Sequence, residues 1–468
     1  RIITFNNQMM EATNADTGKL VATFGTNGQV DLRVGFVGRA ADKVRTIQPS
    51  TPGRVVGDLL IIGGATGEEY GSPPGDIRAF NLVTGKKVWE FHTIPHPGEF
   101  GYDQWKPDMW KTASSANNWG GMAVDEKRGI AYVPLGSASY DFWGVDRPGT
   151  NLFANSLVAL DVKTGKRLWH FQTVHHDLWD YDLTTTPVLM TIDHDGKKVD
   201  VVVQAAKTGF LFVFDRVTGK PMWPIEERPV PKSNVPGEVA SPTQPFVTVV
   251  PPFARQSITA DDIDPRLPHE EYVALQARVR AARNEGLFTP PAEQRTLMFP
   301  GSLGGANWGG GAYLPAEQLL IVNVNTLPFY GELLKTVSNA GGSDHIKAGK
   351  DFSTVMQGTP YTMRMGALQS PLGIPCAAPP WGKLVAVDLA HGSLRWEVPL
   401  GSIHEMGPVK LPFRIDWGTP NLGGGLVTDS GVFFIGATMD RLFRAFDAKT
   451  GKELWSFQLP VDEIGRAS

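Results

Sequence analysis

The chain has 468 residues and a net charge of −4, with 44 basic and 48 acidic side chains. This near balance gives no basic footprint for nucleic acid and no polybasic membrane patch. No stretch reaches the roughly 18 apolar residues of a membrane-spanning helix. Cys376 is the only cysteine, which excludes an intrachain disulfide and a cysteine-based metal cage.

A short phrase occurs six times along the chain. Its shared form is a small or apolar run, an Asp or Asn, three residues, a Gly and, four residues after the Gly, a Trp; the first copy has Ala22 in place of the Trp. The copies are ATNADTGKLVATF (12–24), AFNLVTGKKVWEF (79–91), ALDVKTGKRLWHF (159–171), VFDRVTGKPMWPI (213–225), AVDLAHGSLRWEV (386–398) and AFDAKTGKELWSF (445–457). Each copy predicts a strand, a tight turn and a returning strand. Such a unit cannot bury its face alone, so neighbouring copies must stack.

The spacing of the copies predicts the architecture. The Asp or Asn lies at 14, 81, 161, 215, 388 and 447, so the gaps are 67, 80, 54, 173 and 59 residues. The shortest gaps suit one four-stranded blade, and the gap of 173 has room for further blades whose phrase has decayed, as the strand expected at 318–324 suggests. We therefore predict an all-β propeller of about seven or eight blades in one domain spanning 1–468. A β-solenoid would have shorter, more regular repeats.

The ends of the chain bear on ring closure. The chain begins at Arg1 in mid-pattern and ends shortly after the Trp of the sixth copy, Trp455. Since a propeller usually closes by pairing strands from its two ends, we expect further residues at both ends, including any signal or anchor.

The first unusual polar stretch in chain order is Gly63–Gly71 (GGATGEEYG), which follows a strand expected at Asp58–Ile62. Glycines followed by carboxylates such as Glu69 can present a carboxylate to a closely approaching ligand. The stretch equally suits a glycine-rich surface turn. No Gly-Lys-Ser/Thr follows, so it is not a phosphate-binding P-loop.

Two tryptophans lie beside amide side chains, in Asn117-Asn118-Trp119 and in Asn307-Trp308-Gly309. A Trp flanked by amides can form a stacking platform with hydrogen-bonding groups at its edge. Packing between blades is the simpler interpretation of each Trp.

The stretch Val174–Asp182 (VHHDLWDYD) holds two histidines and three acids. It suits a metal site or an acid–base centre, although it lacks the histidine spacing of known zinc patterns. A charged loop is the alternative, but the interleaved aromatic residues argue for partial burial, where a carboxylate would be perturbed.

Lys207 stands in Gln204–Gly209 (QAAKTG), between strands expected at Val201–Val203 and Phe210–Phe214. A Lys at the head of a hairpin is usually solvated. It becomes important if it faces an anionic or carbonyl ligand.

Residues 226–300 break the β pattern. They are Pro-rich and then predict a helix over His269–Arg283, with Tyr272, Leu275, Val279 and Ala282 on one face and a stop at Gly286. We expect an insertion within the propeller domain, which either shapes a substrate mouth or serves only as a packing lid.

Taken in order, these stretches resemble the quinoprotein dehydrogenases that use pyrroloquinoline quinone (PQQ). The phrase is similar to the tryptophan-docking repeat of their eight-bladed propeller. Four stretches resemble the membrane-bound glucose, quinate and shikimate branch: HHDLWDYDL (175–183), ERPVPKSNVPGEVASPTQPF (227–246), GLFTPPAEQRTLMFPGSLGG (286–305) and SPLGIPC (370–376). The resemblance runs nearly the whole length and implies an eight-bladed all-β propeller, incomplete in this chain.

The resemblance also implies roles for single residues. Asp180, the last acid of HHDLWD, matches the family's catalytic base, and Lys207 matches the basic residue that bonds the ortho-quinone of the cofactor. Trp119 resembles the Trp that forms the floor under the PQQ ring, and Asn117 matches a cofactor-contacting position beside it.

Four further positions follow from the same resemblance. Asn307 and Trp308 match a stretch that borders the cofactor. Glu69 resembles the metal-binding glutamate of the soluble alcohol dehydrogenases, although the glucose branch differs there. Where those enzymes place a metal-binding Asn, this chain has Gly-Ser-Ala-Ser, which makes Ser139 a weak ligand candidate. The family's upper wall over PQQ and its membrane-spanning anchor, which docks to ubiquinone, would precede Arg1.

The implied activity is oxidation of a sugar or polyol hydroxyl, with D-glucose converted to gluconolactone as the first expectation and quinate, shikimate or a polyol as alternatives. Asp180 would take the hydroxyl proton, hydride would pass to PQQ, and Ca²⁺ or Mg²⁺ held by Asp180, Glu69 and the cofactor would polarise the quinone. Electrons would pass to ubiquinone at the periplasmic face of the inner membrane. A non-enzymatic propeller scaffold of envelope protein assembly is the rival, but a scaffold does not need Trp119, Asp180 and Lys207 together.

Overall fold

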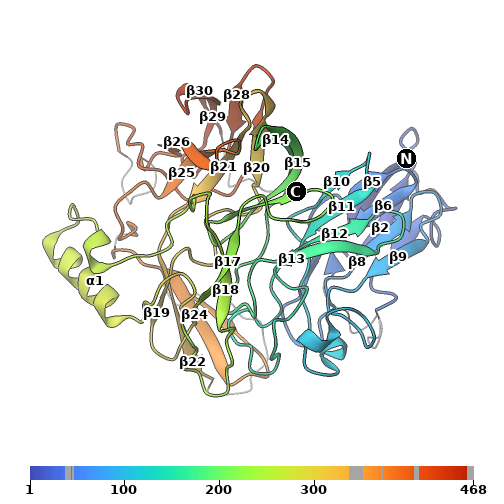
Figure 1. Ribbon diagram of the computed structural model, residues 1–468, viewed down its shortest axis with the longest axis horizontal. Coiled ribbons are helices and arrows are strands. Elements are labelled where there is room, and N and C mark those ends of the chain that lie inside the picture. The colour runs from blue at the N-terminus through green and yellow to red at the C-terminus, as the bar shows by residue number, and fades with distance from the viewer. Residues whose placement is uncertain (37–43, 45–46, 337–350, 372, 405–410, 461–468) are drawn as a thin grey trace. The chain divides into compact units, whose positions relative to one another are not determined.

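The computed structural model describes residues 1–36, 44, 47–336, 351–371, 373–404 and 411–460. These residues form strands β1 to β30, a few short 3-10 turns and one α-helix, α1 (Figure 1). The chain divides into two compact units, Arg1–Asp177 and Leu178–Ser468. Among the helices described, none has the length and apolar character needed to cross a membrane.

The described residues of the first unit form four antiparallel sheets. Three of them carry copies of the phrase. In spatial order they are β1 (Ile2–Asn6), β2 (Met9–Thr13) and β3 (Gln29–Asp31); β5 (Arg54–Val56), β6 (Leu59–Ile62), β8 (Ile77–Asn81) and β9 (Lys87–Phe91); and β10 (Ala123–Asp125), β11 (Ile130–Pro134), β12 (Ser156–Asp161) and β13 (Arg167–Gln172). A two-stranded sheet pairs β4 (Ile47–Gln48) with β7 (Ala65–Thr66).

The second unit contains three more phrase-bearing sheets. They are β14 (Val188–His194), β15 (Lys197–Ala205) and β16 (Leu211–Asp215); β20 (Gly311–Leu314), β21 (Leu319–Asn325), β25 (Gly382–Asp388) and β26 (Ser393–Pro399); and β27 (Gly425–Val427), β28 (Val432–Ile435), β29 (Leu442–Asp447) and β30 (Glu453–Gln458). Strand β20 contacts both β14 and β27, so these three sheets follow one another in space. The other sheets pair β17 (Ile225–Pro229) with β18 (Thr243–Val247), and join β19 (Thr296–Met298), β22 (Phe329–Lys335), β24 (Tyr361–Ala367) and β23 (Phe352–Val355) in that order.

The Asp or Asn of each phrase builds its turn. In the third copy, Asp161 Oδ1 accepts the backbone N–H groups of Lys163 and Thr164 at 3.1 and 2.8 Å, and also the Thr164 hydroxyl at 2.7 Å. Gly165 then adopts a φ of 70°, which a side chain would disfavour. The other five copies repeat both the Asx turn and the positive φ of the glycine. The residues of the phrase therefore specify its turn through contacts between near neighbours in sequence.

In copies two, four and five, the Trp of the phrase docks on the turn glycine of the next copy. A Cβ added to Gly165 would lie 2.5 Å from the ring of Trp89, whose Nε1 donates to Val162 O at 2.8 Å. Trp396 likewise covers Gly451, and its Nε1 donates to the carbonyl of Ala448 at 3.2 Å. The missing side chain of the turn glycine thus creates the surface on which the neighbouring Trp packs.

Two copies depart from the expected hairpin. Copies two, three, five and six form paired strands with a bulge at the small residue. The first copy has only the isolated bridge Thr13–Leu20, and the fourth only Phe214–Pro221. The fourth copy carries Pro221 and Pro224, which remove backbone donors that a ladder needs. In the first copy, Ala22 supplies no ring to dock.

The strand expected at 318–324 does not mark a separate blade. It is β21, which pairs with β25 of the fifth copy along its whole length. Moreover, Trp223 of the fourth copy packs against the turn glycine of the fifth, since a Cβ at Gly392 would lie 3.3 Å from the Trp223 ring. The sheets of the fourth and fifth copies are therefore neighbours in space, although 173 residues separate the two copies in sequence. The strand at 318–324 gives no support for an extra blade between them.

The helix predicted within 226–300 is confirmed as α1 (His269–Ala281), the yellow-green coil of Figure 1. It ends before Gly286. Leu275 and Val279 are buried, and Tyr272 packs beside them against a cluster that includes Leu297 and Phe299. The expected apolar face is therefore the face that packs.

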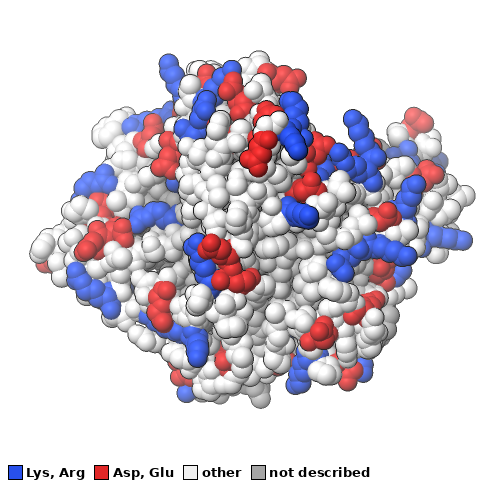
Figure 2. Space-filling view, viewed as in Figure 1, with Lys and Arg blue, Asp and Glu red and all other residues white. Residues whose placement is uncertain are grey.

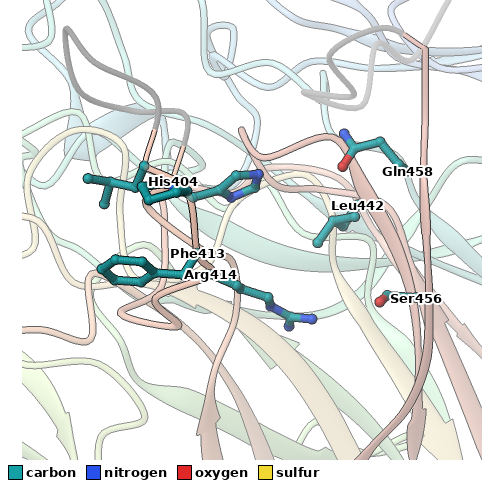
Figure 3. Close-up of a pocket in the computed structure, with 8 residues that line it drawn as sticks. His404, Phe413, Arg414, Leu442, Ser456 and Gln458 are labelled. Atoms are coloured by element: carbon teal, nitrogen blue, oxygen red, sulfur yellow. The ribbon is translucent and has the colours of Figure 1, made fainter.

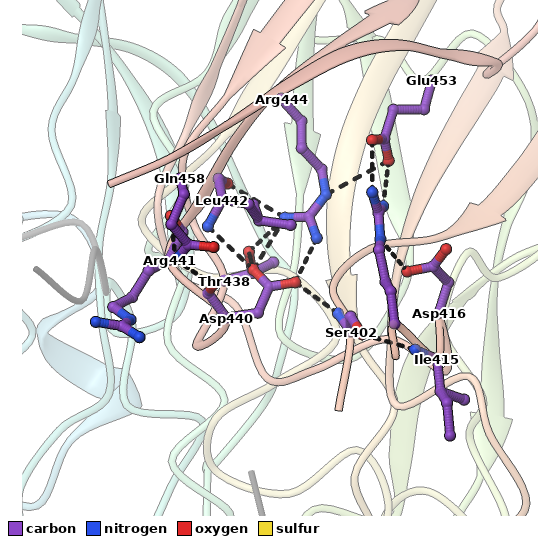
Figure 4. Close-up of polar contacts among 11 residues, drawn as sticks. Ser402, Ile415, Asp416, Thr438, Asp440, Arg441, Leu442, Arg444, Glu453 and Gln458 are labelled. Carbon is purple, nitrogen blue, oxygen red and sulfur yellow. Dashed lines mark hydrogen bonds and ion pairs between the residues drawn. The ribbon is translucent and has the colours of Figure 1, made fainter. Parts of the chain in front are cut away.

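The last phrase-bearing sheet encloses a polar network (Figure 4). Asp440 and Arg444 are an ion pair with almost no exposed surface. Asp440 Oδ1 also accepts the Thr438 hydroxyl at 2.6 Å, and its Oδ2 accepts the N–H of Ser402 at 2.7 Å.

On the surface, acidic and basic side chains are interspersed over the face shown in Figure 2.

Candidate functional site

The predicted site residues fall in both units. Glu69, Asn117, Trp119 and Ser139 belong to the first unit. Asp180, Lys207, Asn307 and Trp308 belong to the second. Each set is described within its own unit.

Lys207 lies in the tight turn between β15 and β16, and only 3% of its side chain is exposed. It is therefore not solvated, unlike most lysines at the head of a hairpin. Its Nζ donates to Asp180 O at 2.8 Å, to Asp180 Oδ1 at 2.9 Å and to Asp182 Oδ2 at 3.1 Å. Burial alone would lower the pKa of Lys207, but the charges of Asp180 and Asp182 outweigh it and raise the pKa well above its usual value. The side chain is therefore a fixed ammonium.

The segment 178–182 brings both carboxylates to this lysine. Trp179 and Tyr181 are buried, with Trp179 Nε1 donating to Thr289 O at 2.8 Å and the Tyr181 hydroxyl donating to Pro300 O at 2.7 Å. The aromatic residues thus anchor the segment to part of the 226–300 stretch, while the acid that follows each of them reaches Lys207.

Asp182 is the residue that the sequence analysis did not single out. It shares Lys207 with Asp180, but its side chain is 11% exposed and that of Asp180 is 25% exposed. The alternation Trp-Asp-Tyr-Asp was the available signal, because two aromatic residues that are buried leave the acids beside them to share other surroundings. Asp180 is the more accessible carboxylate, and its backbone has a φ of 60°, in the left-handed region.

The stretch that carries Asn307 and Trp308 passes over Lys207. A Cβ at Gly304 would lie 2.5 Å from Lys207 Cγ, and the N–H of Gly305 donates to Lys207 O at 2.7 Å. Asn307 turns back on its own loop: its Nδ2 donates to Leu303 O and its Oδ1 accepts the N–H of Trp308, both at 2.8 Å. The role of Asn307 within the protein is therefore to shape the loop that presents Trp308.

In the first unit, three segments are joined around Glu69, Asn117 and Ser139. The Ser139 hydroxyl lies 2.7 Å from that of Ser115, and Asn117 Nδ2 donates to Thr66 Oγ1 at 3.4 Å. The Ser114 hydroxyl donates to the carbonyl of Glu69 at 3.2 Å, and backbone bridges pair Ser115 with Pro74 and with Ala138. These three predicted residues therefore lie in adjacent segments.

Trp119 and Trp308 are not blade-packing tryptophans of the repeated kind. Both are half-buried and lie outside strands, in the segments that precede β10 and β20. The carbonyl of Trp119 accepts the Ser50 hydroxyl at 2.7 Å. Their positions leave the platform interpretation open and set both apart from Trp89 and Trp396.

The remaining polar residues of the 174–182 stretch have structural partners. Nδ1 of His176 lies 2.9 Å from the carbonyl of Gly149, and His175 lies 2.9 Å from Gln172 Oε1. Asp177 accepts hydrogen bonds from Ser137 and, at 2.8 Å, from Asn155. The two histidines thus support loops, and among the described residues they do not belong to the His/Cys/Asp/Glu group that could hold a metal.

A separate cavity of about 600 Å³ opens in the second unit (Figure 3). His404, Phe413 and Arg414 face Leu442, Ser456 and Gln458 across it. The guanidinium of Arg414 is paired with Glu453 and Asp416. No predicted site residue lines this cavity.

The sequence matches the family described as "PQQ: Glucose/ethanol/alcohol dehydrogenase, beta-propeller domain" over residues 1–467. The chain belongs to the PQQ-dependent quinoprotein dehydrogenases. This membership supports the dehydrogenase interpretation over the envelope scaffold.

Known quinoprotein dehydrogenases cover the chain almost completely. It is 36% identical to the quinate/shikimate dehydrogenase (quinone) of Acinetobacter baylyi and 37% identical to quinoprotein glucose dehydrogenase A of Acinetobacter calcoaceticus, over 97% of the chain in each case. It spans 57% of the length of both relatives. A solved quinohemoprotein alcohol dehydrogenase, ADHIIG of Pseudomonas putida HK5, has 25% identity and a TM-score of 0.65, with 96% of this chain and 56% of that chain covered.

The buried polar atoms suit the cofactor of a quinoprotein dehydrogenase, whose quinone and carboxylate oxygens require donors. Beside Lys207, the Thr208 hydroxyl is buried and finds no hydrogen-bond partner within the described residues. The same holds for the Thr184 hydroxyl, two residues after Asp182. Such orphaned groups are rare in native proteins and often mark a ligand or water.

Proposed function

We propose that this chain is the catalytic propeller of a dehydrogenase that oxidises a hydroxyl of a small polyhydroxylated substrate. The observation that carries the proposal is the buried arrangement of Lys207 between Asp180 and Asp182. Burial of three charges is costly, and a perturbed titratable group in such an arrangement is typical of catalytic centres. D-glucose, giving gluconolactone, is the first substrate to test; quinate, shikimate and polyols such as glycerol are the alternatives.

Asp180 is proposed as the base. As the partner of a buried ammonium it is held as a carboxylate, the form that accepts a proton from a substrate hydroxyl. Its greater exposure than Asp182 favours it for contact with substrate. PQQ, when bound, supplies the acceptor for the hydrogen removed from the substrate carbon.

Lys207 is proposed to fix the position of Asp180 and to donate toward the cofactor oxygens. An ammonium has three N–H donors, and Asp180 and Asp182 receive three bonds from it. Binding of an oxygen at Nζ therefore requires exchange of one bond. The bond to Asp182 is the longest of the three at 3.1 Å, which makes it the one that we expect to exchange.

Ca²⁺ or Mg²⁺ remains the proposed metal, because carboxylate oxygens are the ligands that both ions prefer. Glu69 and Asp180 are the proposed ligands. Ser139 is the weaker candidate, since its hydroxyl is hydrogen-bonded to Ser115.

The wider setting is also a proposal. An eight-bladed ring, an insertion at 226–300 and an N-terminal membrane anchor with ubiquinone as acceptor at the periplasmic face all follow the branch that the chain resembles. The names of two relatives, which include "quinone" as acceptor, support a quinone partner.

The test is to titrate PQQ into the purified protein in the presence of Ca²⁺ or Mg²⁺, and then to assay dye reduction with glucose, quinate, shikimate and glycerol. We expect saturable PQQ binding and turnover of at least one substrate, with a lactone from glucose or a ketone from quinate. Lys207→Ala should weaken PQQ binding. Absence of both binding and turnover would refute the proposal, and wild-type PQQ affinity in Lys207→Ala would remove Lys207 from the cofactor site.

A further inference from the structure

A second cluster of metal-ligating side chains lies in the first unit, in the segment that follows β9. His92, His96 and Glu99 recur at intervals of four and three residues in HTIPHPGE. One ligand atom from each lies within 4.8 Å of the other two, the only such group of three found among the described residues. None of these residues has a role in the proposed dehydrogenase chemistry.

Hydrogen bonds already hold the cluster together. Glu99 Oε1 lies 2.8 Å from His92 Nδ1, while Glu99 Oε2 accepts the backbone N–H of His96 at 2.8 Å. The two imidazoles are stacked with centroids 3.8 Å apart, and the Trp110 ring packs against His96. A shared ion would require one ring to rotate out of the stack, which the partial exposure of both histidines permits.

A carboxylate lies near the far side of the His92 ring, just beyond hydrogen-bond distance. Glu90 Oε2 lies 3.8 Å from His92 Nε2, and Lys87 holds the same oxygen at 2.7 Å. Glu90 Oε1 is buried and has no hydrogen-bond partner within the described part of the chain. A carboxylate on the second ring nitrogen fixes the tautomer and orientation of a ligand histidine.

We propose that His92, His96 and Glu99 bind a divalent transition-metal ion, with Zn²⁺ as the best match, and that Glu90 orients His92. Two imidazoles and one carboxylate are a known zinc donor set, with the fourth position left to water. This site is distinct from the Ca²⁺ or Mg²⁺ site proposed for the cofactor, since hard cations prefer oxygen ligands.

Such an ion would cross-link the start of the long connection between β9 and β10. The segment between β9 and β10 is anchored at its start by the buried Ile94 and in its middle by the buried Trp105, and it ends at Asn117 and Trp119. A metal that binds this turn in the folded chain and not in the unfolded chain would stabilise the unit.

The proposal is tested by isothermal titration of the chelator-treated protein with Zn²⁺ in a buffer that contains excess Ca²⁺. We expect one equivalent to bind. Glu90→Gln should weaken binding about 10- to 100-fold, as loss of an outer partner does, and His96→Gln and Glu99→Gln should weaken it more. His269→Gln, which alters an exposed histidine outside the cluster, should bind as the wild type does.

Thermal melts of each variant without metal establish that it folds. Zn²⁺ should raise the melting temperature of the wild type but not those of His96→Gln and Glu99→Gln. If the wild type fails to bind Zn²⁺, or if His96→Gln and Glu99→Gln bind it as the wild type does, the proposal is overturned. Neither result depends on PQQ binding or turnover.

Discussion

Lys207, Asp180 and Asp182 form a group of ion pairs in which the ammonium and the two carboxylates stabilise one another. Removing one partner from a buried group of this kind leaves an uncompensated charge and is strongly destabilising. For the two aspartates, substitutions that keep the size of the side chain are therefore the most informative. Asparagine is the matched replacement for either aspartate, because it keeps an oxygen for Lys207 while it loses the capacity to accept a proton as a carboxylate.

Asp180→Asn is expected to retain the fold and PQQ binding and to lose most turnover. General-base catalysis contributes about 10²- to 10⁴-fold to such reactions, so we expect a loss of kcat in that range with a smaller change in KM. Steady-state dye reduction by the PQQ-loaded variant measures it.

Asp182→Asn is the control for Asp180→Asn, since it alters the other carboxylate on the same lysine. It should retain much more activity than Asp180→Asn. Equal losses in the two variants would mean that both act through Lys207, and near-wild-type turnover in Asp180→Asn would exclude it as the base.

At the scale of residues, the sequence predicted the site partly by itself and partly by resemblance. Reasoning from residue types marked the acids of 174–182 and Lys207 as candidates, and the described contacts join Asp180 to Lys207. It did not single out Asp182, because choosing among three nearby acids requires knowing which side of the chain each faces. It also could not foresee that His176 is bound to a carbonyl.

At the scale of elements, the repeated phrase acts through a pair of residues in different copies. The turn glycines of copies three, five and six leave the space that the Trp of the preceding copy fills. Trp89 is 8% exposed in this arrangement, whereas Trp455, at the same position of the last copy, is 49% exposed.

Trp89→Ala should therefore cost far more stability than Trp455→Ala. Loss of a buried Trp typically costs about 3–5 kcal/mol, and surface substitutions usually change stability by about 0.5 kcal/mol or less. Urea unfolding followed by circular dichroism compares the two variants. Similar losses would show that docking on Gly165 contributes little.

The Asp440–Arg444 pair of the last sheet gives a prediction for acid stability. Burial would raise the pKa of Asp440, but bonds from Arg444, Thr438 and Ser402 outweigh it and hold the pKa below its usual value of 3.8. A carboxyl with a lowered folded-state pKa stabilises the fold above its unfolded-state pKa, and that contribution is lost as pH falls through the folded-state value.

Asp440→Asn is expected to lose about 3–5 kcal/mol at pH 7, as breaking a buried pair does. The difference from the wild type should shrink as the pH falls below about 4. Urea unfolding at pH 7, 5, 4 and 3 measures this, and a constant difference across the series would contradict the assignment to Asp440.

Turns and helices were predictable where residues close together in sequence specify them. The Asx turn and α1 depend on neighbours in sequence, and both were predicted. The paired strands predicted for the first and fourth copies were wrong, since each copy has only an isolated bridge. In the fourth copy two prolines remove backbone donors that a ladder needs, and in the first copy no Trp is present to dock the returning strand. Strand β21 pairs with β25, although β22, β23 and β24 lie between them in sequence. The spacing of the phrase copies alone cannot reveal such a pairing.

At the scale of the whole molecule, the chain is two compact units, each with its own buried clusters. The proposed zinc ligands all lie in the first unit, and Lys207 and its carboxylates all lie in the second. The two proposed ligands should therefore leave different signatures in one experiment on the intact chain.

Hydrogen–deuterium exchange read by mass spectrometry separates them, because a ligand slows exchange where it suppresses local opening. Zn²⁺ should protect peptides from residues 92–112, and PQQ with Ca²⁺ should protect peptides that carry Asp180 and Lys207. Addition of both should give the sum of the two patterns. Protection of the Lys207 peptide by Zn²⁺, with none at 92–112, would move the transition metal to the dehydrogenase centre and leave His92, His96 and Glu99 as a hydrogen-bonded cluster only.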